Sequence, residues 1–124
     1  MHENDSENLL KNTLEELAKE LAPHYEGKLV IRESSEYFDP EKKRLEVNAG
    51  IEPAYHIIEE RSVDFLGFLR ATEEHRVLVA DKRLYGNDVC VLFFNERDRL
   101  SIKKYLLPYV AAQKASRLRL FRMD

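Results

Sequence analysis

Apolar positions are densest between residues 76 and 95, where two short apolar runs flank a turn signal. Val77–Asp81 and Val89–Phe94 carry apolar residues at both strand parities. Strands of this kind are usually covered on both faces, whereas a half-exposed strand alternates between apolar and polar residues. Gly86 and Asn87 tolerate the positive φ that a tight reversal needs. The pattern predicts a central hairpin, buried on both faces, against which the other elements pack.

The N-terminal segment has the spacing of an amphipathic helix. Residues 1–8 are polar and expected to be frayed, with Asp5 or Ser6 as the N-cap. Pro23 and Gly27 end the pattern. Leucines recur at helical spacing and form one apolar stripe, with Leu9 and Ala18 beside them: Leu10, Leu14, Leu17 and Leu21. This segment is predicted to be a packing helix.

Two alternating segments follow and predict a hairpin at the edge of the sheet. Lys28–Arg32 places Leu29 and Ile31 on one face, and residues 38–43 contain a turn signal at Asp39-Pro40. The returning strand is Arg44–Ala49, with Leu45, Val47 and Ala49 facing in and Glu46 and Asn48 facing out. A slip of one residue would reverse those faces, so the register is expected to be firm.

Residues 53–72 allow two interpretations. Pro53 suits the first turn of a helix, and apolar residues follow at mostly helical spacing: Ala54, Ile57, Ile58, Phe65, Phe68 and Leu69. A polar gap at residues 59–62 interrupts this pattern, and Ser62 is a candidate cap for a second helix. The alternative is a short strand over Tyr55–Arg61. The helix is the preferred interpretation.

The C-terminal part predicts a helix and a last strand. Asn95 is the expected N-cap of a helix from Glu96, which carries one apolar side: Ile102, Leu106, Tyr109, Val110 and Gln113. Pro108 lacks an N–H, which predicts a kink or two short helices meeting at Leu107. The last strand, Arg117–Met123, points Leu118 and Leu120 inward and Arg117 and Arg119 outward.

These elements predict one α+β domain over residues 1–124, with a mainly antiparallel sheet, helices packed against it and the order α-β-β-α-β-β-α-β. The succession of helix, hairpin, helix, hairpin and helix resembles, at the level of fold, the small acidic secretion-chaperone and related adaptor domains. The extra basic strand at the end departs from that pattern. A resemblance of fold alone does not fix a function.

Composition narrows the setting of the protein. The single cysteine, Cys90, excludes an internal disulfide, and its place in a central strand predicts a buried thiol. No apolar run approaches the ~20 residues that span a bilayer. The first residues, MHENDSEN, lack a signal-peptide pattern. A cytoplasmic protein without membrane contact is therefore expected.

Charge is distributed unevenly along the chain. Residues 1–60 carry fifteen acidic and seven basic residues, whereas residues 97–124 carry two acidic and eight basic ones. Such asymmetry is a hint about partners. The candidate binding residues lie in the basic part: Lys103, Lys104, Tyr105, Tyr109, Lys114, Arg117, Arg119 and Arg122. A row of this kind suits phosphates or a carboxylate-rich surface, unless acidic residues of the same or a neighbouring subunit already meet it.

Catalytic signatures are weak. His56 precedes Glu59 and Glu60 at helical spacing, which places imidazole and carboxylate on one helix face. A zinc-hydrolase helix needs a second histidine in the same two turns, and none is present. No metal, cofactor or catalytic residue is assigned. An enzyme with a dispersed site would require a pocket lined by at least two of a small set of residues: His24, His56, His75, Glu59 and Glu60.

Three hypotheses follow. The first is a non-catalytic protein-interaction or adaptor module, a homodimer that associates through its last helix and basic last strand. The alternative is a nucleic-acid-binding protein that uses the basic C-terminal segment. The second alternative is a small enzyme with a dispersed site around His56, Glu59 and Glu60.

Overall fold

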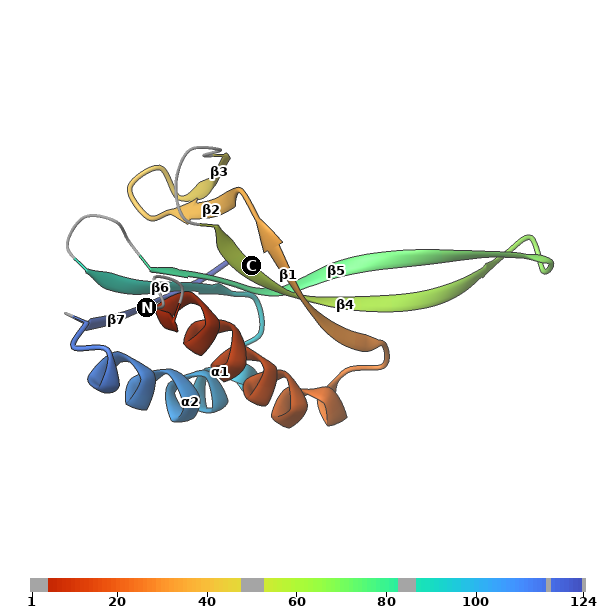
Figure 1. Ribbon diagram of the computed structural model, residues 1–124. Coiled ribbons are helices and arrows are strands. Elements are labelled where there is room, and N and C mark those ends of the chain that lie inside the picture. The colour runs from red at the N-terminus through yellow and green to blue at the C-terminus, as the bar shows by residue number, and fades with distance from the viewer. Residues whose placement is uncertain (1–4, 48–52, 83–86, 116, 124) are drawn as a thin grey trace.

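Helices α1 and α2 cover one face of a five-stranded sheet, and the small β2–β3 sheet lies over part of the other face (Figure 1). The computed structural model describes residues 5–47, 53–82, 87–115 and 117–123. The strand order of the large sheet is β1-β4-β5-β6-β7. All neighbours are antiparallel except β6 and β7. The predicted α+β class and mainly antiparallel sheet are confirmed.

The elements follow one another along the chain as α1 (Asp5–Leu21), β1 (Lys28–Ser34), β2 (Glu36–Asp39), β3 (Arg44–Val47), β4 (Ala54–Phe65), β5 (Leu69–Lys82), β6 (Asp88–Phe93), α2 (Arg99–Ala112) and β7 (Arg117–Arg122). One short 3-10 turn follows α1 (Ala22–His24), and another precedes α2 (Glu96–Asp98).

The central hairpin is confirmed. Strands β5 and β6 pair from Leu78–Phe93 to Lys82–Val89, and every residue of β6 is buried. Asn87 has the positive φ expected of a turn residue (55°), whereas Gly86 lies outside the described residues. The side chains alternate between two clusters, one under the helices and one under β2 and β3. Both faces of this hairpin are therefore covered.

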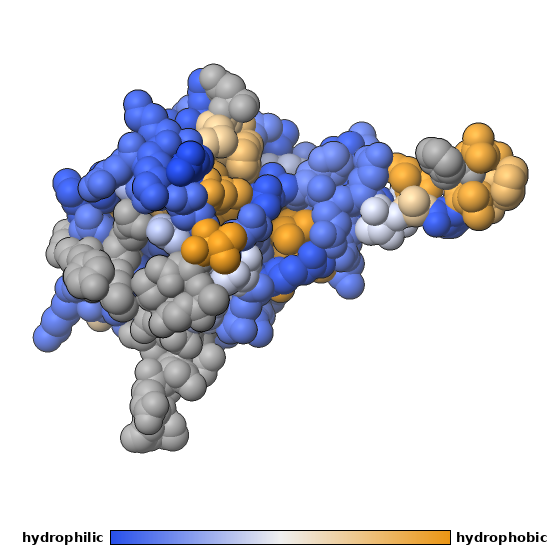
Figure 2. All heavy atoms as spheres, turned by 90° about the horizontal axis from the view of Figure 1, so that it is seen from above, coloured by the Kyte–Doolittle hydropathy of each residue, from blue (hydrophilic) through white to orange (hydrophobic). Residues whose placement is uncertain are grey.

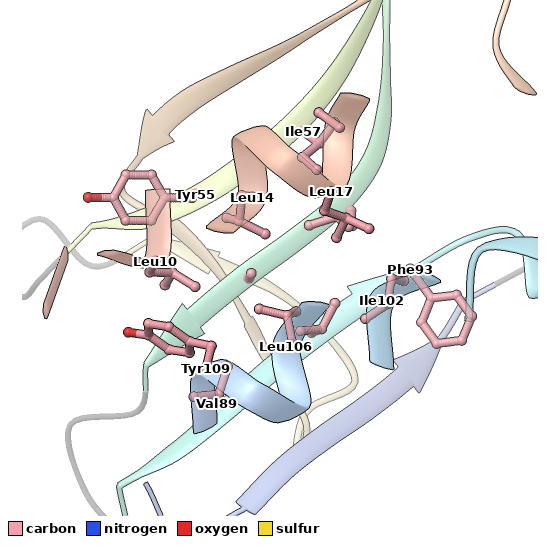
Figure 3. Close-up of a cluster of buried hydrophobic side chains, with 14 of the residues drawn as sticks. Leu10, Leu14, Leu17, Tyr55, Ile57, Val89, Phe93, Ile102, Leu106 and Tyr109 are labelled. Carbon is pink, nitrogen blue, oxygen red and sulfur yellow. The ribbon is translucent and has the colours of Figure 1, made fainter. Parts of the chain in front are cut away.

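The larger cluster lies between the helices and the sheet (Figure 3). Helix α1 contributes the predicted leucine stripe, which is buried throughout, whereas Leu9 beside it is 45% exposed. The sheet contributes residues from three strands: Tyr55, Ile57, Val77, Leu78, Ala80, Val89, Val91 and Phe93. The smaller cluster on the opposite face consists of Phe38, Ala54, Val79 and Leu92. Cys90 is buried as expected.

Helix α2 connects β6 to the parallel strand β7. Asn95 accepts a hydrogen bond from Arg97 N (3.0 Å) and so caps the 3-10 turn that leads into the helix, as predicted. The apolar side of α2 is buried as predicted: Ile102, Leu106, Tyr109 and Val110. The predicted division at Leu107 is wrong, since α2 is continuous through Pro108. Pro108 is exposed, so its ring points away from the packed side and the helix loses only one N–H.

The preferred helix over residues 53–72 is wrong. These residues form β4 and the beginning of β5, and the alternative strand at Tyr55–Arg61 is the correct one. Residues 54–59 are all buried because β4 lies between β1 and β5 and is covered on both faces. In such a strand the apolar residues form a short continuous run, which periodicity cannot distinguish from a helix.

The predicted pairing of residues 28–32 with 44–49 is also wrong. Strand β1 pairs with β4 at the edge of the large sheet, and β3 pairs with β2. The turn between β2 and β3 has the expected chemistry, because Asp39 Oδ1 accepts hydrogen bonds from the N–H groups of residues 41 and 42. Leu45 packs inward, but Val47 is 69% exposed. Ala49 and Asn48 lie outside the described residues.

The leucine stripe of α1 generates a prediction about stability. Leu14→Ala removes a side chain with no exposed surface and leaves a cavity, so it should lower the free energy of unfolding by about 2–5 kcal/mol. Leu9→Ala is the matched control on the same helix and should change it by roughly 0.5 kcal/mol or less. Urea unfolding followed by circular dichroism measures both variants. Equal losses would contradict the burial of this stripe.

Candidate functional site

The eight residues predicted to bind a partner do not form one surface. Lys103 and Lys104 are exposed on α2, whereas Arg117, Arg119 and Arg122 lie on the edge strand β7. Tyr109 is only 6% exposed and belongs to the core under the helices. The predicted set therefore divides into two groups on different elements and one core residue.

The arginines of β7 are already paired with carboxylates. Arg117 Nε lies 3.3 Å from Asp88 Oδ2, and Arg119 Nη1 lies 3.8 Å from the same oxygen. Arg122 Nη1 lies 3.3 Å from Glu96 Oε1. Asp88 is at the beginning of β6, directly beside Arg117 in the parallel register. The basic row therefore meets acidic residues of its own chain.

On the helix side, an acidic residue of α1 meets the basic face of α2. Lys104 Nζ lies 2.6 Å from Glu20 Oε1, and the Tyr105 hydroxyl donates to the same oxygen at 3.2 Å. The hydrogen bond from Lys104 is the main reason that the pKa of Glu20 is lowered. Lys103 and Lys114 are exposed and form no ion pair with any described residue. Two separated lysines do not make a groove for a phosphate backbone.

The proposed grouping of His56 with Glu59 and Glu60 does not exist. In a strand, successive side chains point to opposite faces. His56 therefore lies on the face toward β2, where its Nε2 donates to the Glu36 carbonyl at 3.0 Å. Glu59 lies on the opposite face, and Glu60 pairs with Arg32 at 3.2 Å. Helical spacing predicted neighbours, and the strand separates them.

Glu59 on β4 connects its strand to the segment just before β1. Its Oε2 accepts a hydrogen bond from Gly27 N at 2.8 Å, and its Oε1 lies 3.0 Å from Arg61 Nε. A Cβ at Gly27 would lie 2.3 Å from the Glu60 carbonyl oxygen, so only glycine allows this approach. Burial raises the pKa of Glu59, but the Arg61 guanidinium and the Gly27 N–H outweigh it, and the pKa falls below its usual value. This carboxylate has a structural role.

A cavity of about 620 Å³ lies beside β2 and is lined by His56 and His75 among other residues. Four of its charged groups form ion pairs: Arg76 with Glu36 at 2.9 Å, and Arg32 with Glu74 at 2.8 Å. His56 is only 2% exposed, and its burial lowers its pKa. Glu59 is not part of the lining. Two of the residues required for a dispersed enzyme site thus line this cavity. Among the described residues, no cluster that could hold a metal ion and no hydrogen-bonded pair of a base and a nucleophile accompanies them.

The most distinctive feature is an arm that projects from the sheet (Figure 1). Strand β1 stops pairing at Lys28 opposite Glu60, and β6 begins to pair with β5 only at Leu78. Residues 61–65 of β4 and 69–73 of β5 therefore pair with each other alone, as far as the structure describes the chain, whereas residues 74–76 lie opposite residues 58–60, which also pair with β1. We call residues 61–73 the arm. An isolated two-stranded ribbon is only marginally stable in water.

The end of the arm is apolar. Leu66, Phe68 and Leu69 are 71%, 78% and 51% exposed, and we call residues 66–69 the tip. Figure 2 shows these hydrophobic residues gathered at the far end of the arm. The turn has positive φ at Leu66 (58°) and Gly67 (79°). For leucine this conformation is strained, which is common at functional sites.

Among the other described residues, the exposed large apolar side chains are Leu9 on α1, Val47 on β3, and Leu100 and Leu107 on α2. Single exposed apolar residues are normal on a protein surface, whereas the tip brings three of them together within four residues. The sequence contained one signal for this turn. Gly67 interrupts the apolar residues 65–69, and an isolated glycine lowers the expectation of a helix. The helical interpretation instead places Phe65, Phe68 and Leu69 on the apolar face of a helix.

In the part of the chain that the structure describes, no helix is both long and apolar enough to cross a membrane.

Glu59 generates a prediction about acid stability. Because the folded carboxyl holds its proton less tightly than the unfolded one, its contribution is complete above pH 4.5 and is lost as the pH falls through the folded pKa. Glu59→Gln should lower the free energy of unfolding by about 1–3 kcal/mol at pH 7. On acidification to pH ~3, the variant should lose less stability than the unsubstituted protein. Urea unfolding across this range measures both effects. Glu41→Gln, an exposed control, should match the unsubstituted protein; a parallel acid profile for Glu59→Gln would contradict the assignment.

Asp88 generates a prediction about the basic strand. Asp88→Asn removes the carboxylate shared by Arg117 and Arg119, so the variant should elute from heparin at higher salt, with a salt slope larger by about one to two charges. Asp64→Asn is the control, because it changes the net charge equally on the arm. The same shift in both variants would show that net charge, and not the arginine pair, controls retention.

The chain matches no protein-family model, and comparisons with curated proteins and with solved structures found no match.

Proposed function

We propose that the protein is a non-catalytic protein-interaction module that contacts its partner through the tip of the arm. The supporting observation is the group of exposed apolar side chains at the end of a ribbon beside which no third strand of the described residues pairs. Burying a leucine or phenylalanine side chain fully is worth about 1.5–3 kcal/mol. Contact at the tip would therefore stabilise both the complex and the arm.

This contact surface replaces the last helix and strand expected from the sequence. The arginines of β7 and Lys104 already have carboxylate partners within the chain. A second partner for them would have to displace those carboxylates, which reduces the gain from binding. For the same reason, binding of nucleic acid by this segment has less support than contact at the tip.

A protein partner suits the arm better than a lipid surface. Along residues 61–65, no strand in the described ranges of the chain pairs with the outer edge of β4. Unpaired backbone groups are not tolerated in the interior of a bilayer, whereas a protein strand or loop can satisfy them. Near the tip, Asp64 and Arg70 lie 3.6 Å apart, so no cationic surplus favours anionic lipid.

Photo-crosslinking in cells that express the protein tests this proposal. With p-benzoylphenylalanine in place of Phe68, we expect a protein adduct of defined mass, which disappears when Leu66→Ser is added. The same amino acid in place of Leu100 is the control, because Leu100 is 79% exposed but lies on α2. Equal adducts at both positions, or none at position 68, would overturn the proposal. So would flotation with phosphatidylcholine vesicles that is abolished by Phe68→Ser.

A further inference from the structure

The arm has two free edges, one on each strand. The β4 edge runs over Arg61–Phe65, where β1 no longer pairs, and the β5 edge runs from Leu69 to Arg76, before β6 begins. Free edges present a row of unpaired N–H and C=O groups and accept another strand readily. The length of five residues at ~3.3 Å each gives the β4 edge roughly 17 Å for such pairing.

We infer that the partner is a second copy of this chain. The two copies pair their β4 edges antiparallel around a two-fold axis, and each tip lies in a groove beside the base of the other arm. This inference rests on the proposed function, because it uses the same tip and names what covers it.

The charge pattern distinguishes the two edges. Pairing of β4 with its own copy, centred on Val63, places Val63 opposite Val63 and Ser62 opposite Asp64, so no like charges face each other. The β5 edge carries four consecutive ionisable residues, Glu73–Arg76, whereas the β4 edge carries only Arg61 and Asp64, which are not adjacent. Like charges directly opposite destabilise a strand pair, and charged edges resist pairing. The β4 edge is therefore the one suited to a second copy.

The position of β1 determines where the tip of the partner arrives. In the pairing centred on Val63, Phe65 of the second copy lies opposite Arg61, one position beyond the Lys28–Glu60 pair that ends β1. The incoming strand continues the line of β1, and its turn meets the chain at Gly27 and Lys28. The tip thus reaches the end of α1 and the beginning of β1.

A cavity of about 520 Å³ is present at that place, between α1 and β1. Gly27 and Lys28 line it together with five apolar residues, Ala18, Ala22, Leu29, Val30 and Ile31, and with the charged residues Lys11, Glu15 and Lys19 at its α1 side. Leu29 and Ile31 are half-buried and pack against the larger cluster between the helices and the sheet. A volume of this order is typical of a site for a small molecule, and it is large enough for a few apolar side chains. Leu66 and Phe68 of the second copy have the chemistry to fill it.

The arrangement is closed by symmetry. Each copy gives one edge and one tip and receives the same from its partner, which makes the interface self-complementary. Both β4 edges are used, so a third copy has no equivalent site. A homodimer is the expected assembly.

Substitutions on the two-fold axis test the inference with the purified full-length protein. We expect a dimer by size-exclusion chromatography with light scattering and by sedimentation equilibrium. Val63→Lys should weaken dimerisation at least about tenfold, because two lysines would face each other. Ala71→Lys is the matched control, since Ala71 pairs with Val63 across the arm but lies on the β5 edge, and it should remain dimeric. Circular dichroism checks that both variants are folded.

Charge reversal supplies the signature of the axis. Val63→Glu alone should also be largely monomeric, whereas an equimolar mixture of Val63→Glu and Val63→Lys should form heterodimers, because position 63 faces itself. With the photoreactive residue at position 68, purified protein should give a dimer adduct that maps to residues 18–31 of the second copy. Retained dimers of Val63→Lys, or an adduct that maps elsewhere, would overturn this arrangement.

The outcome also separates this inference from the proposed function. A protein that is monomeric at high concentration, but whose position 68 forms a tip-dependent adduct with another protein in cells, would overturn the self-pairing and leave the interaction module intact. A monomer without any such adduct would overturn both.

Discussion

The two-sided burial of the central strands is the constraint on which the rest of the fold depends. Strand β6 and the second half of β5 have no exposed face, so water must be excluded from both sides of the sheet. The helices do this on one side with the leucines of α1 and the apolar side of α2. The β2–β3 sheet does it on the other, through Phe38. Each layer is therefore required by the apolar residues of the hairpin.

The arm follows from a difference in strand length. Strands β4 and β5 have 12 and 14 residues, whereas β1 and β6 have 7 and 6. The helices and the short strands cover only the part of the long hairpin that lies over the core. A β-bulge between Ile57 and Ile58, opposite Val77, lies where the covered part gives way to the arm. Bulges increase the local twist and re-aim side chains. The tip at the end of the arm also faces water, although Leu66, Phe68 and Leu69 are apolar.

The charge asymmetry of the sequence is mostly resolved within the molecule. Glu20 of α1 meets Lys104 of α2, and Asp88 and Glu96 meet the arginines of β7. Exposed ion pairs contribute little to stability individually, but they determine what remains available at the surface. A basic segment that looks open along the sequence is thus partly neutralised in the folded chain. This is why the apolar tip, and not the basic segment, is the stronger candidate for a contact.

The sequence by itself determined the elements with a clear local signal: the α1 stripe and the β5–β6 hairpin from their apolar spacing, the Asn95 cap from its side chain, and the last strand from its alternation. In these segments the spacing of apolar residues follows directly from one packed face or from two. Only the tertiary structure decided that residues 54–65 form a strand, which carboxylate meets which arginine, and that His56 and Glu59 face apart. The spacing of apolar residues indicates which side chains avoid water. It does not show which neighbour covers such a side chain, or whether any neighbour covers it. The tip shows this most clearly. Its leucines and its phenylalanine are residue types typical of a core, but they lie past the ends of the neighbouring strands β1 and β6 and are exposed.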